Sequence, residues 1–126
     1  MTDDQLAQRI AQAREYERTI KAMTFRLRIP TRNEMRVMWA EARDGGGDAA
    51  LRIAASFTIL RTSLLSVRGA TTADLKLPGD VEPLPSTLAS ALALVDHRDD
   101  LAMELNDELL EKMRVRNEEL EADEKN

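Results

Sequence analysis

The sequence predicts a mainly α-helical fold, a small domain of about five helices with one short extended segment near residues 24–30. Apolar residues recur at spacings of three and four along most of the 126-residue chain, which is the period of an amphipathic helix. Strict alternation of apolar and polar residues, typical of a half-buried strand, occurs only within 24–30. Aromatic residues make up only 3% of the chain, so aliphatic side chains and methionines must form the core.

The first predicted helix runs from Asp3 to about Met23 and is treated as an N-terminal unit, residues 1–23. Asp3 and Asp4 suit the positive end of its dipole. Its apolar residues share one face of a helix, with Tyr16 beside them: Leu6, Ile10, Ala13, Ile20 and Met23.

The predicted core domain, residues 24–116, begins with the extended segment, which Pro30 ends. The sequence Thr31-x-x-Glu34 has the form of a capping box and predicts a second helix from about Arg32 to Arg43. The three glycines at 45–47 are expected to terminate that helix.

Asp48 is expected to cap a third helix over residues 49–68, which is apolar around most of its circumference and should be the most buried element. Residues 69–85 hold two Gly and three of the four Pro, and a loop of this length is usually a binding loop or disordered. A short fourth helix follows from Ser86 or Thr87, and a last helix carries leucines at steps of four. The acidic tail, residues 117–126, is expected to fray because its charge opposes the helix dipole.

Composition excludes several classes of protein. The absence of Cys removes disulfides and sulfur-ligated metal centres and is compatible with a reducing cytoplasm. The longest uncharged stretch, residues 83–95, has 13 residues, short of the roughly 20 that span a bilayer, so no membrane association is expected.

The charge is unevenly distributed along the chain. Residues 1–68 hold 12 basic and 8 acidic side chains, whereas residues 69–126 hold 6 and 15. Attraction between helices of one domain explains this asymmetry, and so does head-to-tail self-association or an acidic end that binds a basic partner. Nucleic acid is not an expected partner, because the basic half has no dense Lys/Arg cluster.

No catalytic, cofactor or metal site is predicted, and the chain is not expected to be an enzyme. The turn formed by residues 44–48 lacks the Lys-Ser/Thr of a phosphate-binding loop. His97 is the only histidine, and the acidic residues around it are too close in sequence to converge on a metal ion. Glu104, Glu108 and Glu111 lack the histidines that a diiron site would need.

Protein binding is the remaining function, and its candidate residues are large apolar side chains on the predicted helices. Trp39 fits a core anchor as well as an interface residue, and flexible methionines serve cores as well as adaptable binding surfaces. The candidate residues are Leu6, Ile10, Tyr16, Met35, Met38, Trp39, Met103 and Met113.

The order of segments resembles that of the small tail assembly chaperones of long-tailed bacteriophages. The resemblance covers residues 24–113 and rests on their layout. Its parts are the extended Phe25-Arg26-Leu27-Arg28-Ile29-Pro30, the helix start at 30–34, an Ala-rich helix ending near Leu64-Leu65-Ser66-Val67, a Gly/Asp loop, Pro83-Leu84-Pro85-Ser86-Thr87, and a Leu-rich helix followed by Asp99-Asp100-Leu101. It implies a non-enzymatic protein of the host cytoplasm that keeps tape-measure or tail-tube subunits soluble until the tail is built. The helix predicted over residues 3–23 departs from that layout.

Other classes of protein share these features. A regulatory or anti-host interaction module has the same composition, and so does a structural head or tail-connector protein that assembles into a ring.

We predict that a chain shortened before Asn117 keeps its fold, because the acidic tail lies outside the predicted core domain. The complex with a bound subunit should become less soluble, since the removed charge is negative. Circular dichroism and centrifugation of the complex measure the two effects, and an unfolded truncated chain would contradict this division of the molecule.

Overall fold

The computed structural model describes residues 1–44 and 57–125, and within them not the side chains of residues 38, 39, 41–44, 124 and 125. The labelled elements, in chain order, are α1 (Asp3–Arg14), β1 (Glu15–Ile20), β2 (Met23–Arg28), α2 (Arg32–Asp44), β3 (Leu64–Arg68), α4 (Leu88–His97) and α5 (Asp99–Lys125). Residues 57–63 are also helical.

The prediction of a mainly α-helical fold was wrong, because the chain forms a mixed α/β structure. Helices hold most of the described residues, and three strands accompany them. The strands make one antiparallel sheet in the order β1-β2-β3. A single extended segment was predicted, and it corresponds to β2, the middle strand of this sheet.

The helix predicted from Asp3 to Met23 ends at Arg14, and residues 15–28 form a β-hairpin instead. Tyr16 and Ile20 are four residues apart, and this spacing places them on one face of a strand as well as of a helix. Their partners across the hairpin are Leu27 and Met23. Lys21, with φ of +55°, opens the two-residue turn. The spacing of Tyr16 and Ile20 fits a helix and a strand equally well. Pairing with β2 therefore determines that this segment forms a strand.

The prediction of a third helix over residues 49–68 was also wrong at the C-terminal end of that helix. Its described part is helical at 57–63 and then becomes β3. Thr24 of β2 pairs with Arg68 of β3, and a bulge follows at Arg26/Leu27. A continuous apolar run does not distinguish a buried strand from a buried helix. The remainder of that prediction, with the glycines at 45–47 and the Asp48 cap, lies outside the described residues.

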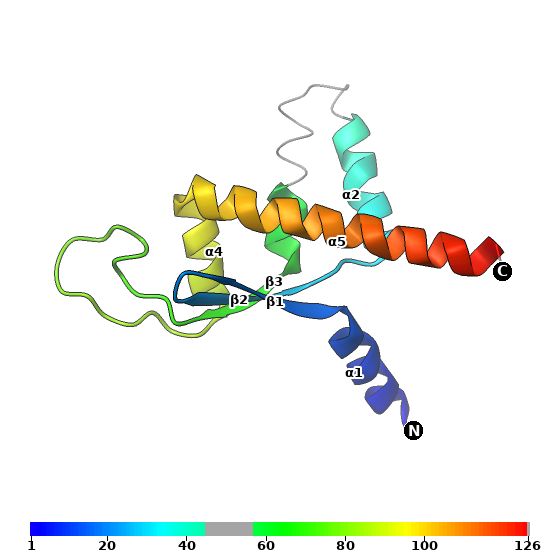
Figure 1. Cartoon of the computed structure of the whole chain (residues 1–126), viewed down its shortest axis with the longest axis horizontal. Helices are drawn as coiled ribbons and strands as arrows, with labels where there is room; N and C mark the ends of the chain where they lie inside the picture. The colour runs from blue at the N-terminus through cyan, green and yellow to red at the C-terminus, as the bar shows by residue number, and fades with distance from the viewer. Residues whose placement is uncertain (45–56, 126) are drawn as a thin grey trace.

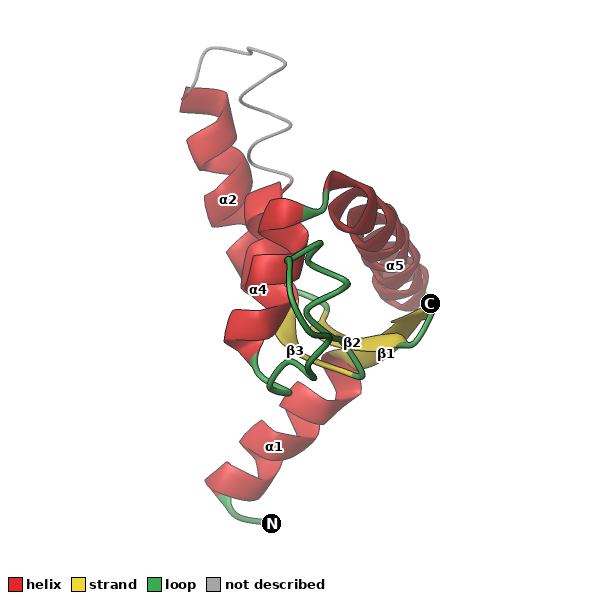
Figure 2. Ribbon diagram, turned by 90° about the vertical axis from the view of Figure 1, so that its left-hand side faces the viewer, coloured by secondary structure: helices red, strands yellow, loops and turns green. Residues whose placement is uncertain are grey.

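The helices α4 and α5 cover one face of the sheet (Figures 1 and 2). The other face carries polar residues that are not buried, such as Glu17, Thr24 and Arg26. Inward-facing side chains of β2 and β3 meet leucines of both helices in one core. Its largest fully buried side chains are those of Met23, Phe25, Leu27, Ile59, Leu60, Leu64, Val67, Leu94, Leu101, Leu105 and Leu109. On the opposite face, Arg68 reaches across β2 to Glu17, with Nη1 2.8 Å from Oε1.

The second helix was predicted correctly, and so was its capping box. The Glu34 amide donates to the Thr31 hydroxyl, and the Thr31 amide donates to the Glu34 carboxylate, both at 3.0 Å. Two hydrogen bonds from Arg28, at 2.9 and 2.7 Å, hold the same carboxylate. The Arg28 hydrogen bonds, together with those from Thr31, lower the pKa of Glu34 to about 2 although partial burial opposes the shift.

The C-terminal half also contains its two predicted helices. Thr87 caps α4 by accepting from the Ser90 amide. α5 continues through the acidic residues to Lys125, beyond the point at which the tail was expected to fray. The long predicted loop, seen as the large excursion in Figure 1, is held by backbone bonds from Thr72 to Glu82 and from Leu84 to Ala70, both 2.9 Å.

Ion pairs within the chain join its oppositely charged halves. Arg18 of β1 pairs with Glu104 and Glu108 of α5, at 3.0 and 2.8 Å. Arg61 pairs with Asp96, where α4 ends. Attraction within one domain, one of the two explanations of the charge asymmetry, therefore operates here.

We predict that Gly69→Ala destabilises the fold far more than Gly79→Ala. Both glycines have positive φ, +78° and +98°. A Cβ at Gly69 would meet the Ala22 carbonyl oxygen of the hairpin turn at 2.3 Å, whereas nothing lies within 4 Å at Gly79. The free energy of unfolding in urea should fall by on the order of 3 kcal/mol at Gly69 and about 1 kcal/mol at Gly79. Equal losses of unfolding free energy in the two variants would show that the positive φ, and not the clash with the Ala22 carbonyl oxygen, causes the destabilisation.

Candidate protein-binding surface

The structure separates the eight predicted protein-binding residues instead of gathering them on one surface. Leu6, Ile10 and Met103 are exposed, at 48%, 52% and 57%. Tyr16 and Met35 are half-buried and pack against the core, and Met113 belongs to the core. Met38 and Trp39 lie on α2, and their side chains are outside the description.

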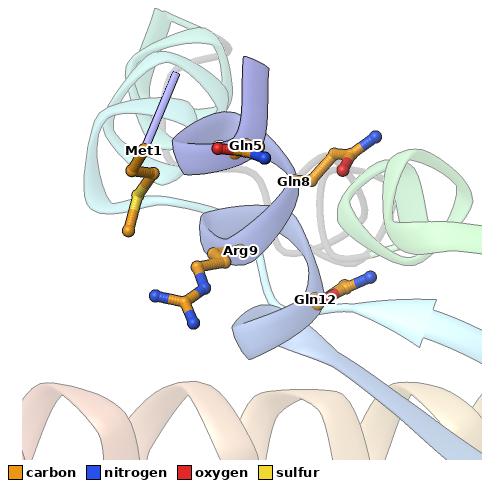
Figure 3. Close-up of a pocket in the computed structure, with 5 residues that line it drawn as sticks. All are labelled: Met1, Gln5, Gln8, Arg9 and Gln12. Carbon is orange, nitrogen blue, oxygen red and sulfur yellow. The ribbon is translucent and has the colours of Figure 1, made fainter. Parts of the chain in front are cut away.

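The helix α1 exposes its large apolar side chains. None of its residues is buried. It leaves the sheet on the side opposite α5 (Figure 1). Leu6 and Ile10, one helical turn apart, lie on the same side of α1. The other side is polar, and Figure 3 shows its hollow lined by Met1, Gln5, Gln8, Arg9 and Gln12.

The join between α1 and the sheet is held by Arg14, the last residue of the helix. Its carbonyl oxygen accepts from the Ile29 amide at 2.8 Å. Its guanidinium donates to the carbonyl oxygens of Ile29 and Pro30, at 3.1 and 3.3 Å. The helix therefore extends the hairpin without an intervening linker, and its orientation follows from that of β1.

A cluster of charged side chains and Tyr16 lies where α5 crosses β1. Arg18 donates to Glu104 and Glu108, and the Lys112 ammonium stands over the Tyr16 ring, 4.7 Å from its centroid. The phenol oxygen of Tyr16 is buried and has no partner among the described residues. Burial, with a smaller contribution from Glu108, raises the pKa of Tyr16 above its ordinary value.

Sequence analysis missed the hollow that adjoins this region. It is lined by Ile29, Glu108, Glu111, Lys112, Val115, Arg116 and Glu119. Ile29 was assigned to the extended segment, and Val115 lies beside the leucine stripe of the last helix. The sequence pattern therefore shows Ile29 and Val115 as separate apolar residues. They line one hollow only because α5 packs on the hairpin.

The residues near His97 have structural partners. Arg98 binds Asp100 through two nitrogens and donates to the Asp74 carbonyl oxygen at 2.9 Å. In the described part of the chain, no group of three or more His, Asp and Glu side chains is placed to hold a metal ion. Over the same residues, no helix has the length and apolar content of a membrane span.

Comparison with known proteins gave no match. No family model, curated protein or solved structure matches it. The class of the protein therefore rests on its own architecture, a two-layer α/β domain whose helix α1 has no buried residue.

We predict that Tyr16 makes the fold sensitive to alkali. The unfolded phenol ionises near pH 10 and the folded one only at higher pH, so its contribution to stability is complete below about pH 10. It declines as the pH rises above that value, by about 1 kcal/mol at pH 11. Urea unfolding of the native protein and of Tyr16→Phe between these pH values isolates the effect. A parallel decline of both proteins would contradict it.

Proposed function

We propose that this protein is a non-enzymatic tail assembly chaperone of a long-tailed bacteriophage. It acts in the cytoplasm of the host cell, where it binds tape-measure or tail-tube subunits and keeps them soluble before tail assembly. The observation that carries the proposal is the uncovered helix α1, whose Leu6 and Ile10 are about half exposed, at 48% and 52%.

An exposed apolar helix suits a protein that holds another. Aggregation-prone subunits expose apolar surface until they assemble, and a second apolar surface can cover it. Because α1 has no buried residue, its whole apolar side remains available without opening the core. Attachment of α1 to the hairpin through Arg14 keeps that side in one orientation, which lowers the ordering cost of binding.

The charge of α5 supports the same proposal. The helix holds 11 acidic and 4 basic side chains, a net charge of −7. Repulsion between such helices keeps complexes apart, so a bound subunit would be carried in solution without association of its carriers. The resemblance in segment order over residues 24–113 points to the same class of protein, with one part corrected, since Leu64-Leu65-Ser66-Val67 belongs to β3 and not to a helix.

We predict that Leu6→Glu/Ile10→Glu strongly reduces client solubilisation, whereas Gln8→Glu/Gln12→Glu does not. Both double variants add the same charge to α1, but the first pair lies on its apolar side and the second on its polar side. Each variant is co-expressed with the tape-measure and tail-tube subunits encoded by the same genome, and the soluble client is measured after centrifugation. The apolar-side variant should recover on the order of tenfold less client.

The fold of both variants should be unchanged, because none of the four side chains is buried. Circular dichroism checks this point. Equal recovery with the two variants would remove α1 from the binding surface.

A pull-down of the tagged native chain separates the other classes. Recovery of a host protein alone would instead indicate a regulatory module. Recovery of a closed ring of the chain itself, also present in finished particles, would indicate a structural component.

A further inference from the structure

Two arginines near the start of α2 have no carboxylate partner among the described residues. The Arg14 guanidinium donates through Nε and Nη2 to the carbonyl oxygens of Ile29 and Pro30, which leaves its positive charge without a counter-ion. Arg116 of α5 has a buried Nε without a hydrogen-bond partner, and no described carboxylate forms an ion pair with its guanidinium. Because that Nε is buried, the Arg116 side chain packs against the protein, and this packing limits the positions of its guanidinium.

The two guanidinium groups lie near each other. Ile29, whose carbonyl oxygen accepts from the Arg14 Nε at 3.1 Å, also lines the hollow that contains Arg116. Burial lowers the pKa of Arg14, and the nearby charge of Arg116 lowers it further. Glu34 opposes this shift, but two hydrogen bonds from Arg28 hold its carboxylate. Two like charges held together without a counter-ion favour the binding of an anion.

The carboxylates that line the hollow do not cancel this charge. Arg18 donates to Glu108 at 2.8 Å, and Arg114 binds Glu111 through two nitrogens. Glu119 also lines the hollow, without an ion pair to a described cation. It opposes one of the two unpaired arginine charges. The remaining excess suits a carboxylate, which carries one negative charge, better than a phosphate group with a charge of about −2.

Apolar side chains complete the hollow, and its shape suits a segment of a protein chain. Ile29 is half-buried and Val115 is 39% exposed. Six of the seven lining residues belong to α5, so the hollow lies along the flank of this helix. Small molecules are usually held in clefts that bury most of their surface. A helix flank with an apolar floor instead accepts a side chain whose backbone continues beyond the contact.

We infer that this hollow binds an acidic residue of a partner protein together with the apolar residue beside it. The carboxylate would accept hydrogen bonds from the Arg116 guanidinium and from Nη1 of Arg14, which no described group accepts. The apolar side chain would cover Ile29 and Val115. The site goes beyond the proposed function. It does not include the apolar side of α1, so a failure of client binding there would leave this inference standing.

The probe is the peptide acetyl-Ala-Leu-Glu-Leu-Ala-amide, whose blocked termini leave its Glu as the only charge. One control peptide has Gln in place of Glu, and the other has Gly in place of both Leu. Nuclear magnetic resonance of the isotope-labelled full-length chain follows the Nε–H signals of Arg14 and Arg116 during each titration. The probe should shift both signals, and each control should bind on the order of tenfold more weakly. Equal binding of the Gln peptide, or no shift of the arginine signals, would overturn the inference.

Two small anions separate a partner protein from other sources of negative charge. Sodium acetate supplies a carboxylate without an apolar neighbour, and inorganic phosphate supplies a higher charge. Both should bind on the order of tenfold more weakly than the peptide, because acetate leaves the apolar floor uncovered and phosphate is repelled by Glu119. If either anion bound as tightly as the peptide, the hollow would be a general anion site and the assignment to a partner protein would be wrong.

Substitution of the lining residues provides the last comparison. Arg116→Gln should weaken peptide binding by on the order of tenfold. Its matched control is Arg9→Gln, which removes the same charge from α1 outside the hollow and should leave the affinity unchanged. Equal affinities of the two variants would contradict the role of Arg116.

Glu119→Gln tests the same site in the opposite direction. It removes the carboxylate that opposes the arginine charge, so peptide affinity should rise by about threefold. This variant also keeps the inference testable if Arg116→Gln does not fold, which circular dichroism checks. An affinity that stayed the same or fell in Glu119→Gln would overturn the inference.

Discussion

The central strand β2 is the constraint on which the rest of the structure depends. Met23, Phe25 and Leu27 are at most 1% exposed, and their burial requires a neighbour on each edge and a helix layer above. β1 and β3 supply the edges, and α5 together with α4 supplies the layer. Burying three large side chains in this way contributes several kcal/mol, of the order of the net stability of a small domain. No comparable burial fixes α1, which has no buried residue.

Arg18 links this buried layer to the acidic helix. It lies on the inward face of β1, where an apolar residue would be expected, and its guanidinium donates to Glu104 and Glu108. These carboxylates are one turn apart on α5, so the contact sets the rotation of the helix about its own axis as well as its position. Half-exposed pairs contribute little stability individually. The contact between Arg18 and the two carboxylates instead fixes the orientation of α5, because it determines which flank of the helix faces the edge strand β1.

Sequence analysis predicted the elements whose determinants are local and missed those that depend on distant partners. The capping box of Thr31 and Glu34 identifies the start of α2 without knowledge of the rest of the chain. The hairpin was missed because Tyr16 and Ile20 satisfy the helical and the strand period equally, and the choice is made by pairing with residues 23–28. β3 was missed because a continuous apolar run shows neither the helical nor the strand periodicity. The same limit applies to the binding residues, since Leu6 and Met113 have similar patterns but only the second is buried.

The two uncovered surfaces of the molecule differ in what they can recognise. The apolar side of α1 makes no use of main-chain hydrogen bonds, so it accepts partners by area and shape and tolerates variation in their sequence. The β1 edge offers main-chain donors and acceptors at fixed positions, so it requires an extended backbone. Since Arg14 joins α1 to β1 directly, both surfaces belong to one continuous backbone. A partner that occupied both would gain from their short separation, because the second contact would form at high effective concentration.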